Sequence, residues 1–184
     1  GALDSSRFKT YLSQALDKPA NDVSAMVIGG HGDTTMIPLT RLASYNGMPV
    51  SQFLSQNQLD KVAADTMVGG ATLTALLGTS AWYAPGAAAA EVAEAIIHDQ
   101  KCMIPCSCLL DGEYGEKDLC IGVPCILGKG GIEKIIELDL NEEEKEAVKD
   151  YATDKGYIVE EENGKLNIYE SKEEEAPSAL VSDL

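Results

Sequence analysis

The stretch VIGGHGDTTMIPL, residues 27–39, decides the fold because it joins two apolar runs through a glycine-rich turn. Val27 and Ile28 predict the end of a buried strand, which Gly29 and Gly30 then break. His31 follows at once, although the chain has only two histidines. An imidazole titrates near neutrality and can exchange a proton with a substrate oxygen. His31 is therefore the first candidate for chemistry, with a structural role at the strand end as the alternative.

Net charge and hydropathy limit the partners of the chain. Its 184 residues include 30 acidic and 14 basic side chains, which gives a formal charge of −16. This charge disfavours nucleic acid and anionic membranes, since phosphate contacts need clustered Lys and Arg. No apolar run reaches the roughly 20 residues of a membrane helix. The chain starts at GALDSSRF without an initiator Met or a signal-peptide pattern, and we expect it to be part of a longer protein.

The five cysteines do not fit a disulfide framework, because they are few, oddly spaced and odd in number. Cys102, Cys106 and Cys108 share parity, so on a strand they face one side. Zinc binding is an alternative, but the C-x3-C-x-C spacing lacks CxxC pairs and no histidine lies nearby. We expect these three, with Cys120 and Cys125, to be reduced and buried as small hydrophobic residues. A reducing compartment follows, hence a cytoplasmic protein.

Periodicity divides the chain into helical and extended segments. Residues 4–17 predict a helix with an Asp-Ser-Ser cap, and residues 58–80 a second one in which Gly69 and Gly70 permit close packing or a bend. A third helix spans residues 80–101 and tolerates Pro85 near its first turn. Helix spacing also covers residues 140–156, where Asn141 is the cap and Gly156 the stop. Strands are predicted over the following ranges: 21–30, 102–112, 118–128 and 131–140.

This order of elements predicts an α+β fold, with long helices packed on a largely antiparallel sheet, and not a regular βαβ alternation. The main domain spans residues 1–150. Residues 151–184 form an acidic C-terminal extension, in which Asn163-Gly164 predicts a hairpin over residues 157–169. The remaining residues are acidic and poor in core residues, which is typical of a disordered tail.

Two segments carry candidate chemistry: LDSSR at residues 3–7 and GGHGD at residues 29–33. Asp4 and Arg7 are three residues apart, so a helix points both to one side. A carboxylate on one nitrogen of His31 fixes its tautomer, and an arginine fork binds a substrate carboxylate through two parallel hydrogen bonds. The combination suits acid–base chemistry on a small carboxylic acid.

Alternative interpretations stand beside this one. Asp4 alone is typical of a helix cap, Arg7 of a surface residue, and Asp33 of a turn. His98 near a helix end is compatible with a structural role. A hydrolase would combine His31 and Asp4 with a nearby serine, Ser5 or Ser6, but the chain has no G-x-S-x-G elbow. A non-catalytic domain that binds a partner through its acidic tail is the other alternative.

LDSSRFK followed by VIGGHGDTTMIPL resembles the lactate/malate dehydrogenase family, specifically its C-terminal, substrate-binding domain. Arg7 and His31 are 31 − 7 = 24 positions apart and Asp4 precedes Arg7 by three, as in that family's pattern. The resemblance covers residues 1 to about 150. Three later segments resemble the family in the same order: LLGTSAWYAP, MIPCSCLLDGEYG and IGVPCILGKGGIEKIIELDLNEEEK.

The resemblance implies a role for each matching residue. His31 exchanges a proton with the substrate oxygen, Asp4 supports its imidazolium, and Arg7 binds the substrate carboxylate. Ser80 lies in the substrate pocket, Pro85 lies near the cofactor, and no metal is involved. The glycines around His31 then let substrate and cofactor approach it closely.

The resemblance also implies NAD as the cofactor and a 2-hydroxy or 2-oxo dicarboxylic acid as the substrate. TSAWYAP and LDGEYG resemble the malate branch of the family more than the lactate branch. No G-x-G-x-x-G loop follows a strand, so we expect the nucleotide-binding Rossmann half to be absent and the fragment alone to be inactive. Its partners would be that missing half and further subunits, as a dimer or tetramer, with the helix around residues 58–77 contributing an interface.

Overall fold

A five-stranded antiparallel sheet forms the centre of the molecule, which we describe from a computed structural model. The structure describes residues 1–115, 117–154, 157–162 and 165–170. The strand order is β3 (Met36–Pro38), β2 (Val27–Gly29), β7 (Lys117–Gly128) and β6 (Cys102–Asp111), and β8 (Gly131–Ile135) also pairs with β7. Strands β6, β7 and β8 form an antiparallel meander, and residues 136–140 lie outside β8, although a strand is predicted over 131–140.

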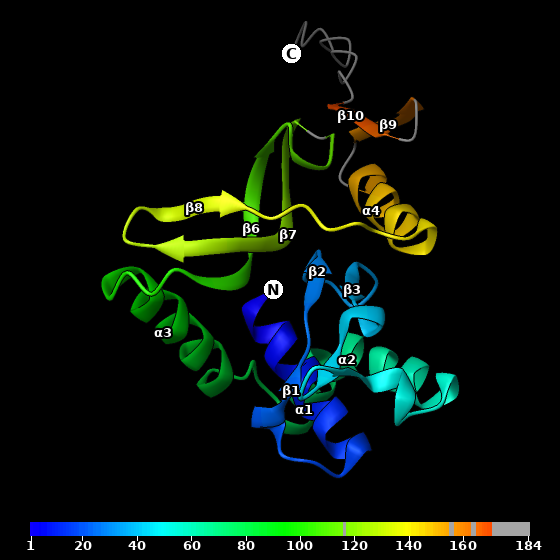
Figure 1. Ribbon diagram of the computed structural model, residues 1–184, viewed down its shortest axis with the longest axis vertical. Helices are drawn as coiled ribbons and strands as arrows, with labels where there is room; N and C mark the ends of the chain where they lie inside the picture. The colour runs from blue at the N-terminus through cyan, green and yellow to red at the C-terminus, as the bar shows by residue number, and fades with distance from the viewer. Residues whose placement is uncertain (116, 155–156, 163–164, 171–184) are drawn as a thin grey trace, which may run out of the picture.

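In the described part of the chain, four helices lie around this sheet: α1 (Ala2–Leu16), α2 (Gln56–Leu77), α3 (Tyr83–Ile97) and α4 (Glu142–Asp154). Figure 1 shows the long β6–β7 hairpin rising above the part of the molecule that contains α1 and α2, with α4 at its right. A smaller antiparallel sheet joins β1 (Val23–Ser24), β4 (Ser44–Tyr45) and β5 (Met48–Pro49). Short 3-10 helices occur at Ala20–Asp22, Thr40–Leu42, Val50–Gln52 and Glu113–Gly115. The predicted α+β fold is confirmed.

Two hydrophobic clusters hold these elements together. The first packs the inner face of the sheet against α3 and α4 and includes Ile28, Leu110, Ile121 and Ala152. The second packs α1 against the start of α2 and includes Phe8, Leu12 and Leu59, among other residues. Strand β2 contributes to both clusters, since Ile28 belongs to the first and Val27 to the second. The loop that follows β2 is therefore anchored from both sides.

Close backbone contact fixes the position of β2 against β7. Gly29 and Gly122 face each other in the register, and a Cβ on Gly122 would lie 2.6 Å from the carbonyl oxygen of Gly29. That distance is too short for any side chain, so β7 needs glycine where it meets β2.

The C-terminal helix begins with a capping box. The Glu144 backbone N–H donates to Asn141 Oδ1, and the Asn141 N–H donates to Glu144 Oε2, each at 2.9 Å. Asn141 is thus the predicted cap. Arg41 Nη2 also pairs with Glu144 Oε2 at 2.9 Å and ties α4 to the Thr40–Leu42 turn.

Other predicted boundaries need correction or fall outside the described residues. Helix α1 begins at Ala2, so Asp4 lies inside its first turn and is not its cap. Strands β9 (Tyr157–Glu162) and β10 (Lys165–Glu170) pair antiparallel, whereas Gly156, the turn at Asn163-Gly164 and the tail from residue 171 lie outside the described residues. No helix in the described ranges is long and apolar enough to cross a membrane.

Candidate active site

Helix α1 carries two of the candidate side chains on one face. Phe8 and Leu12 are fully buried and hold this helix against the second core cluster. The same packing places Asp4 in the interior, where it is 1% exposed, while the side chain of Arg7 is 17% exposed. A buried carboxylate needs charged or hydrogen-bonding partners, because it has lost its hydration.

Both oxygens of Asp4 have such a partner. Arg7 Nη1 donates to Oδ1 at 3.1 Å, one turn along the same helix. His31 Nδ1 lies 2.7 Å from Oδ2, across 27 residues of sequence. A carboxylate can only accept, so Nδ1 carries the hydrogen and Nε2 is left for another partner. The structure therefore brings the three candidate residues into one hydrogen-bonded group.

A buried hydrogen bond sets the register between the two elements of this group. The Val27 N–H of β2 donates to Ser5 Oγ of α1 at 2.9 Å. Ser5 follows Asp4 directly, and Val27 begins the strand that leads to His31. The Ser5 hydroxyl thus aligns the helix with the strand. It is not placed as a nucleophile beside His31, which argues against the hydrolase alternative.

Gly29 and Gly30, which were expected to let substrate and cofactor approach His31, are required for another reason. Gly29 has φ +86°, and a Cβ there would lie 2.5 Å from the Thr35 carbonyl oxygen. A Cβ on Gly30 would collide with the Thr35 side chain and come within 2.7 Å of Tyr151 Cε2 in α4. These two glycines close the turn against the protein itself, so the expectation that they leave space for a ligand is wrong.

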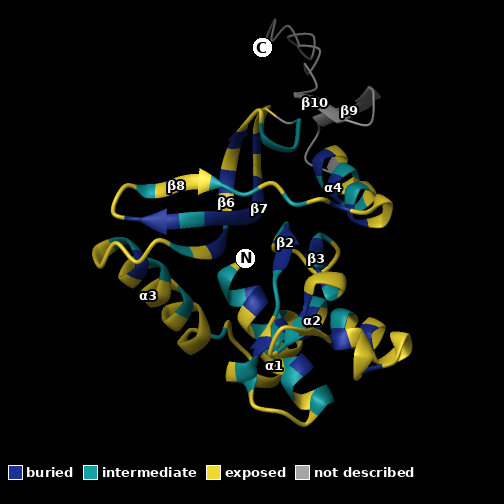
Figure 2. Cartoon of the chain, in the orientation of Figure 1, coloured by how far each residue is buried: buried dark blue, intermediate teal, exposed yellow. Residues whose placement is uncertain are grey.

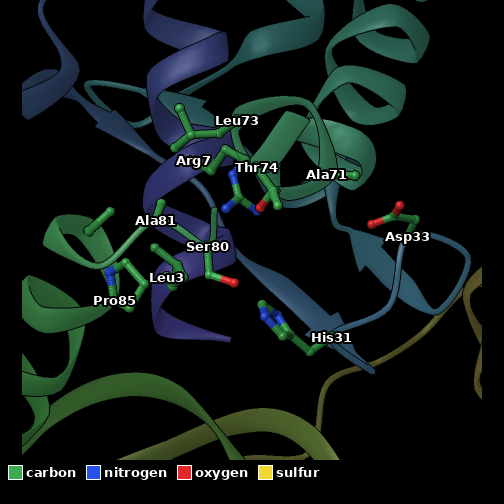
Figure 3. Close-up of a pocket in the computed structure, with 12 residues that line it drawn as sticks. Leu3, Arg7, His31, Asp33, Ala71, Leu73, Thr74, Ser80, Ala81 and Pro85 are labelled. Atoms are coloured by element: carbon green, nitrogen blue, oxygen red, sulfur yellow. The ribbon is translucent and has the colours of Figure 1, made fainter. Parts of the chain in front are cut away.

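A cavity of about 350 Å³ opens beside this group. Figure 3 shows His31 pointing toward Ser80, and the Arg7 guanidinium lying next to Thr74. His31 is 72% exposed, so its free nitrogen is accessible from this side. The cavity is lined by residues of α1, the His31 turn, α2 and α3: Leu3, Arg7, His31, Asp33, Gly70, Ala71, Leu73, Thr74, Ser80, Ala81, Ala84 and Pro85.

Ser80 and Pro85 thus lie in the same cavity as His31 and Arg7, while Asp33 sits in the turn at its edge. Thr74 was not singled out from the sequence. Its spacing of four residues from Gly70 on α2 was the available signal, because such residues share a helix face. His98 lies elsewhere, exposed at the C-terminal end of α3.

The cysteines form a separate group on β6 and β7. Cys108 and Cys125 are buried and Cys106 is half-buried, but Cys120 is exposed, so the expected burial of Cys120 is wrong. Burial raises the pKa of the Cys106 and Cys125 thiols to about 11. No three metal-binding side chains among the described residues are grouped to hold an ion.

The cavity fits a small acid better than a whole dinucleotide. Its volume of about 350 Å³ is at the low end of the range for drug-sized ligands. Ser80, Ala81, Ala84 and Pro85, which lie before and in the first turn of α3, form one wall of the cavity. A whole dinucleotide would need binding groups outside this cavity.

Taken together, the fold and the site place an imidazole, a buried carboxylate and a guanidinium in one hydrogen-bonded group beside a cavity. Residues 1–156 match the family described as lactate/malate dehydrogenase, alpha/beta C-terminal domain. The chain therefore belongs to the lactate/malate dehydrogenase family and represents its C-terminal domain.

Relatives and solved structures agree with this assignment. Malate dehydrogenase of Flavobacterium johnsoniae is 74% identical over 145 residues, which are 79% of this chain and 47% of the relative. The structure of malate dehydrogenase from Salinibacter ruber matches with a TM-score of 0.81 and 47% identity, covering 84% of this chain and 50% of that one.

Lactate dehydrogenase from Eimeria maxima, solved with NADH and oxamate, matches with a TM-score of 0.80 and 40% identity, over 84% of this chain and 48% of that one. The chain spans about half the length of the curated relatives it matches.

Proposed function

We propose that this chain is the catalytic half of an NAD-dependent malate dehydrogenase, which interconverts malate and oxaloacetate. The observation that carries the proposal is the buried Asp4 carboxylate, which bonds His31 Nδ1 at 2.7 Å and Arg7 Nη1 at 3.1 Å beside one cavity. The three groups supply a proton carrier, its counter-charge and an anion-binding fork.

His31 performs the proton transfer. When a 2-hydroxy acid is oxidised, the neutral ring accepts the hydroxyl proton at Nε2, because Nδ1 already carries a hydrogen toward Asp4. The resulting imidazolium is stabilised by the Asp4 carboxylate, which is shielded from water. In the reverse direction Nε2–H donates the proton to the carbonyl oxygen of the 2-oxo acid.

Arg7 orients the substrate. Its Nη1 is held by Asp4, so the rest of the guanidinium is available to a carboxylate in the cavity. Gripping the carboxylate presents the neighbouring carbon and its oxygen to His31. NAD, when bound, supplies and accepts the hydride.

The preference for malate over lactate is supported by relatives and not by the cavity. The malate dehydrogenase of Flavobacterium johnsoniae is 74% identical, compared with 40% for the lactate dehydrogenase of Eimeria maxima. Among the described residues, Arg7 is the one cation lining the cavity. A second substrate carboxylate would therefore need a partner from the other half of the subunit.

Exposed apolar residues on α2 and α3 support the proposal that this chain binds the remainder of its subunit and further subunits. Figure 2 shows much of α3 as exposed, and residues 71–77 of α2 are exposed as well. Leu76 is 80% exposed and Tyr83 is 90% exposed, and the neighbouring Leu77 and Trp82 are also exposed, as is Ile97 at the other end of α3. Apolar patches of this kind mark protein interfaces. We assign this surface to the remainder of the subunit and to a homo-oligomer, in the cytoplasm as the free cysteines suggest.

The test is a fusion in which this chain replaces the matching region of the Flavobacterium johnsoniae relative and is joined to the remainder of that protein. We expect oxidation of NADH by oxaloacetate at a kcat/KM at least 100-fold above that with pyruvate, and no turnover by the 184-residue chain alone. A fusion that prefers pyruvate would favour the lactate alternative. A folded fusion inactive with both acids would contradict the proposed function.

A further inference from the structure

Helix α2 has two adjacent glycines in its middle, Gly69 and Gly70, which the mechanism above does not use. Glycine in a helix interior costs about 1 kcal/mol relative to alanine. The pair does not end α2, which continues to Leu77. We therefore expect an interaction that compensates for this loss of helix stability, and the contacts of the two glycines identify it.

The side chain of Arg7 lies across these glycines. A Cβ on Gly69 would lie 2.5 Å from Arg7 Cδ and 3.1 Å from its Nε. Gly69 is buried, and the Tyr11 hydroxyl oxygen lies 3.1 Å from the same Cβ position, so Arg7 and Tyr11 occupy the space that a side chain would need. A Cβ on Gly70 would lie 3.6 Å from Arg7 Nη2, an ordinary contact. The aliphatic stem of the Arg7 side chain therefore packs on α2 at Gly69, and its guanidinium lies beside Gly70 at the cavity.

We propose that Gly69 is a positioning residue, whose missing side chain lets Arg7 reach both Asp4 and the substrate carboxylate. The effect on substrate binding rests on the proposed function, whereas the effect on the position of Arg7 rests on its packing against Gly69 alone. An alanine at position 69 would push the Arg7 stem away from α2, since a contact of 2.5 Å cannot persist. Both the bond to Asp4 and the orientation of the fork would change with it.

A direct test observes Arg7 itself in the 184-residue chain. Arg7 and Arg41 are its two arginines, so the Nε–Hε region of a 1H–15N spectrum holds two signals, which R41K assigns. We expect G69A to shift the Arg7 signal strongly and leave the Arg41 signal in place. G70A should shift the Arg7 signal less. The control is V68A on the exposed face of the same helix, which should move neither signal.

The kinetic test uses the fusion protein. We expect G69A to raise the KM for oxaloacetate at least 10-fold with kcat within about 3-fold, and V68A to keep the wild-type KM. In an R7A background, G69A should add less than a 2-fold further loss in kcat/KM, because no arginine remains to be displaced. If G69A lowers kcat/KM by the same factor in the R7A background as in the wild-type background, the proposal is overturned.

The two readouts separate this proposal from the proposed function. An unchanged Arg7 signal in folded G69A overturns the role of Gly69, whatever the fusion does. An inactive fusion with a displaced Arg7 signal contradicts the dehydrogenase assignment and leaves the positioning role supported. If G69A does not fold, R7A/G69A should fold with the melting temperature of R7A, and its failure to fold would overturn the proposal.

Discussion

Asp4 Oδ2 of helix α1 lies 2.7 Å from His31 Nδ1 in the turn after β2, although the two residues are 27 positions apart in the sequence. The bond exists because two other contacts bring these elements together. Ser5 accepts the Val27 N–H, and the fully buried Phe8 packs with Val27 in one cluster. The site is thus built on the core and not on a free loop.

Replacing Arg7 by lysine tests the anion-binding role. Lysine keeps the charge but cannot form two parallel hydrogen bonds. A lost charge-assisted hydrogen bond is worth about 1.5–3 kcal/mol, so we expect the KM of the fusion for oxaloacetate to rise about 10- to 100-fold. Steady-state NADH absorbance measures it. The matched control is R41K, at the chain's other arginine, which pairs with Glu144 and should leave KM unchanged. Equal effects of the two variants would argue against Arg7 as the substrate ligand.

Replacing Asp4 by asparagine tests the counter-charge. The amide keeps the shape of the side chain but cannot balance an imidazolium or hold Arg7 as an ion pair. General acid–base catalysis contributes about 10²–10⁴-fold, and we expect D4N to lose at least the lower figure in kcat/KM. D65N, which removes an acid from the exposed face of α2, serves as the control. Wild-type kcat/KM in D4N would rule out this role.

Replacing Ser5 by alanine tests the contact that aligns α1 with β2. The buried Val27 N–H would lose its partner, which costs about 1–3 kcal/mol in the free energy of unfolding. Urea unfolding of the 184-residue chain measures this difference. S6A alters the neighbouring exposed serine and should stay within about 0.5 kcal/mol of wild type. A neutral S5A would show that other contacts set the register.

The buried thiols predict a loss of stability in alkali. Burial raises the pKa of Cys125 to about 11, whereas an unfolded cysteine has a pKa of about 8.5. Between these values the unfolded chain releases the proton and the native state keeps it, so stability falls as pH rises. The slope for this thiol is at most about 1.4 kcal/mol per pH unit.

Urea unfolding at pH 8, 9.5 and 10.5 measures the effect of the thiols. C125A should be less stable than wild type at pH 8 because of the cavity, but it should lose less stability on going to pH 10.5. C120S, at the exposed thiol, should keep the wild-type slope. Identical slopes in all three proteins would contradict the role of burial.

Much of the fold follows from short-range patterns in the sequence. Phe8 and Leu12 at helical spacing, Asn141 before a run of acids, and the β-branched runs of β6 and β7 each specify local structure. The start of α1 was misplaced by two residues because Gly1 accepts the first backbone hydrogen bond, from the Ser5 N–H. A backbone contact of this kind leaves no side-chain signal in the sequence.

The candidate site was only partly visible from the sequence. Spacing indicated that Asp4 and Arg7 share a helix face, but the meeting of Asp4 with His31 depends on tertiary packing. The reason for Gly29 and Gly30 was mistaken, since the atoms that exclude a Cβ there belong to Thr35 and Tyr151, the latter 121 residues from Gly30. Long-range contacts of this kind have no periodic signature in one sequence.

The central claim is that His31 carries the proton in an oxidoreductase of 2-hydroxy acids. Its most direct test is kcat for NADH oxidation by oxaloacetate in the fusion, comparing H31Q with H98Q at the chain's other histidine. We expect kcat to fall about 10²–10⁴-fold in H31Q and to stay at the wild-type value in H98Q. Turnover of folded H31Q at the rate of the unaltered fusion would contradict it.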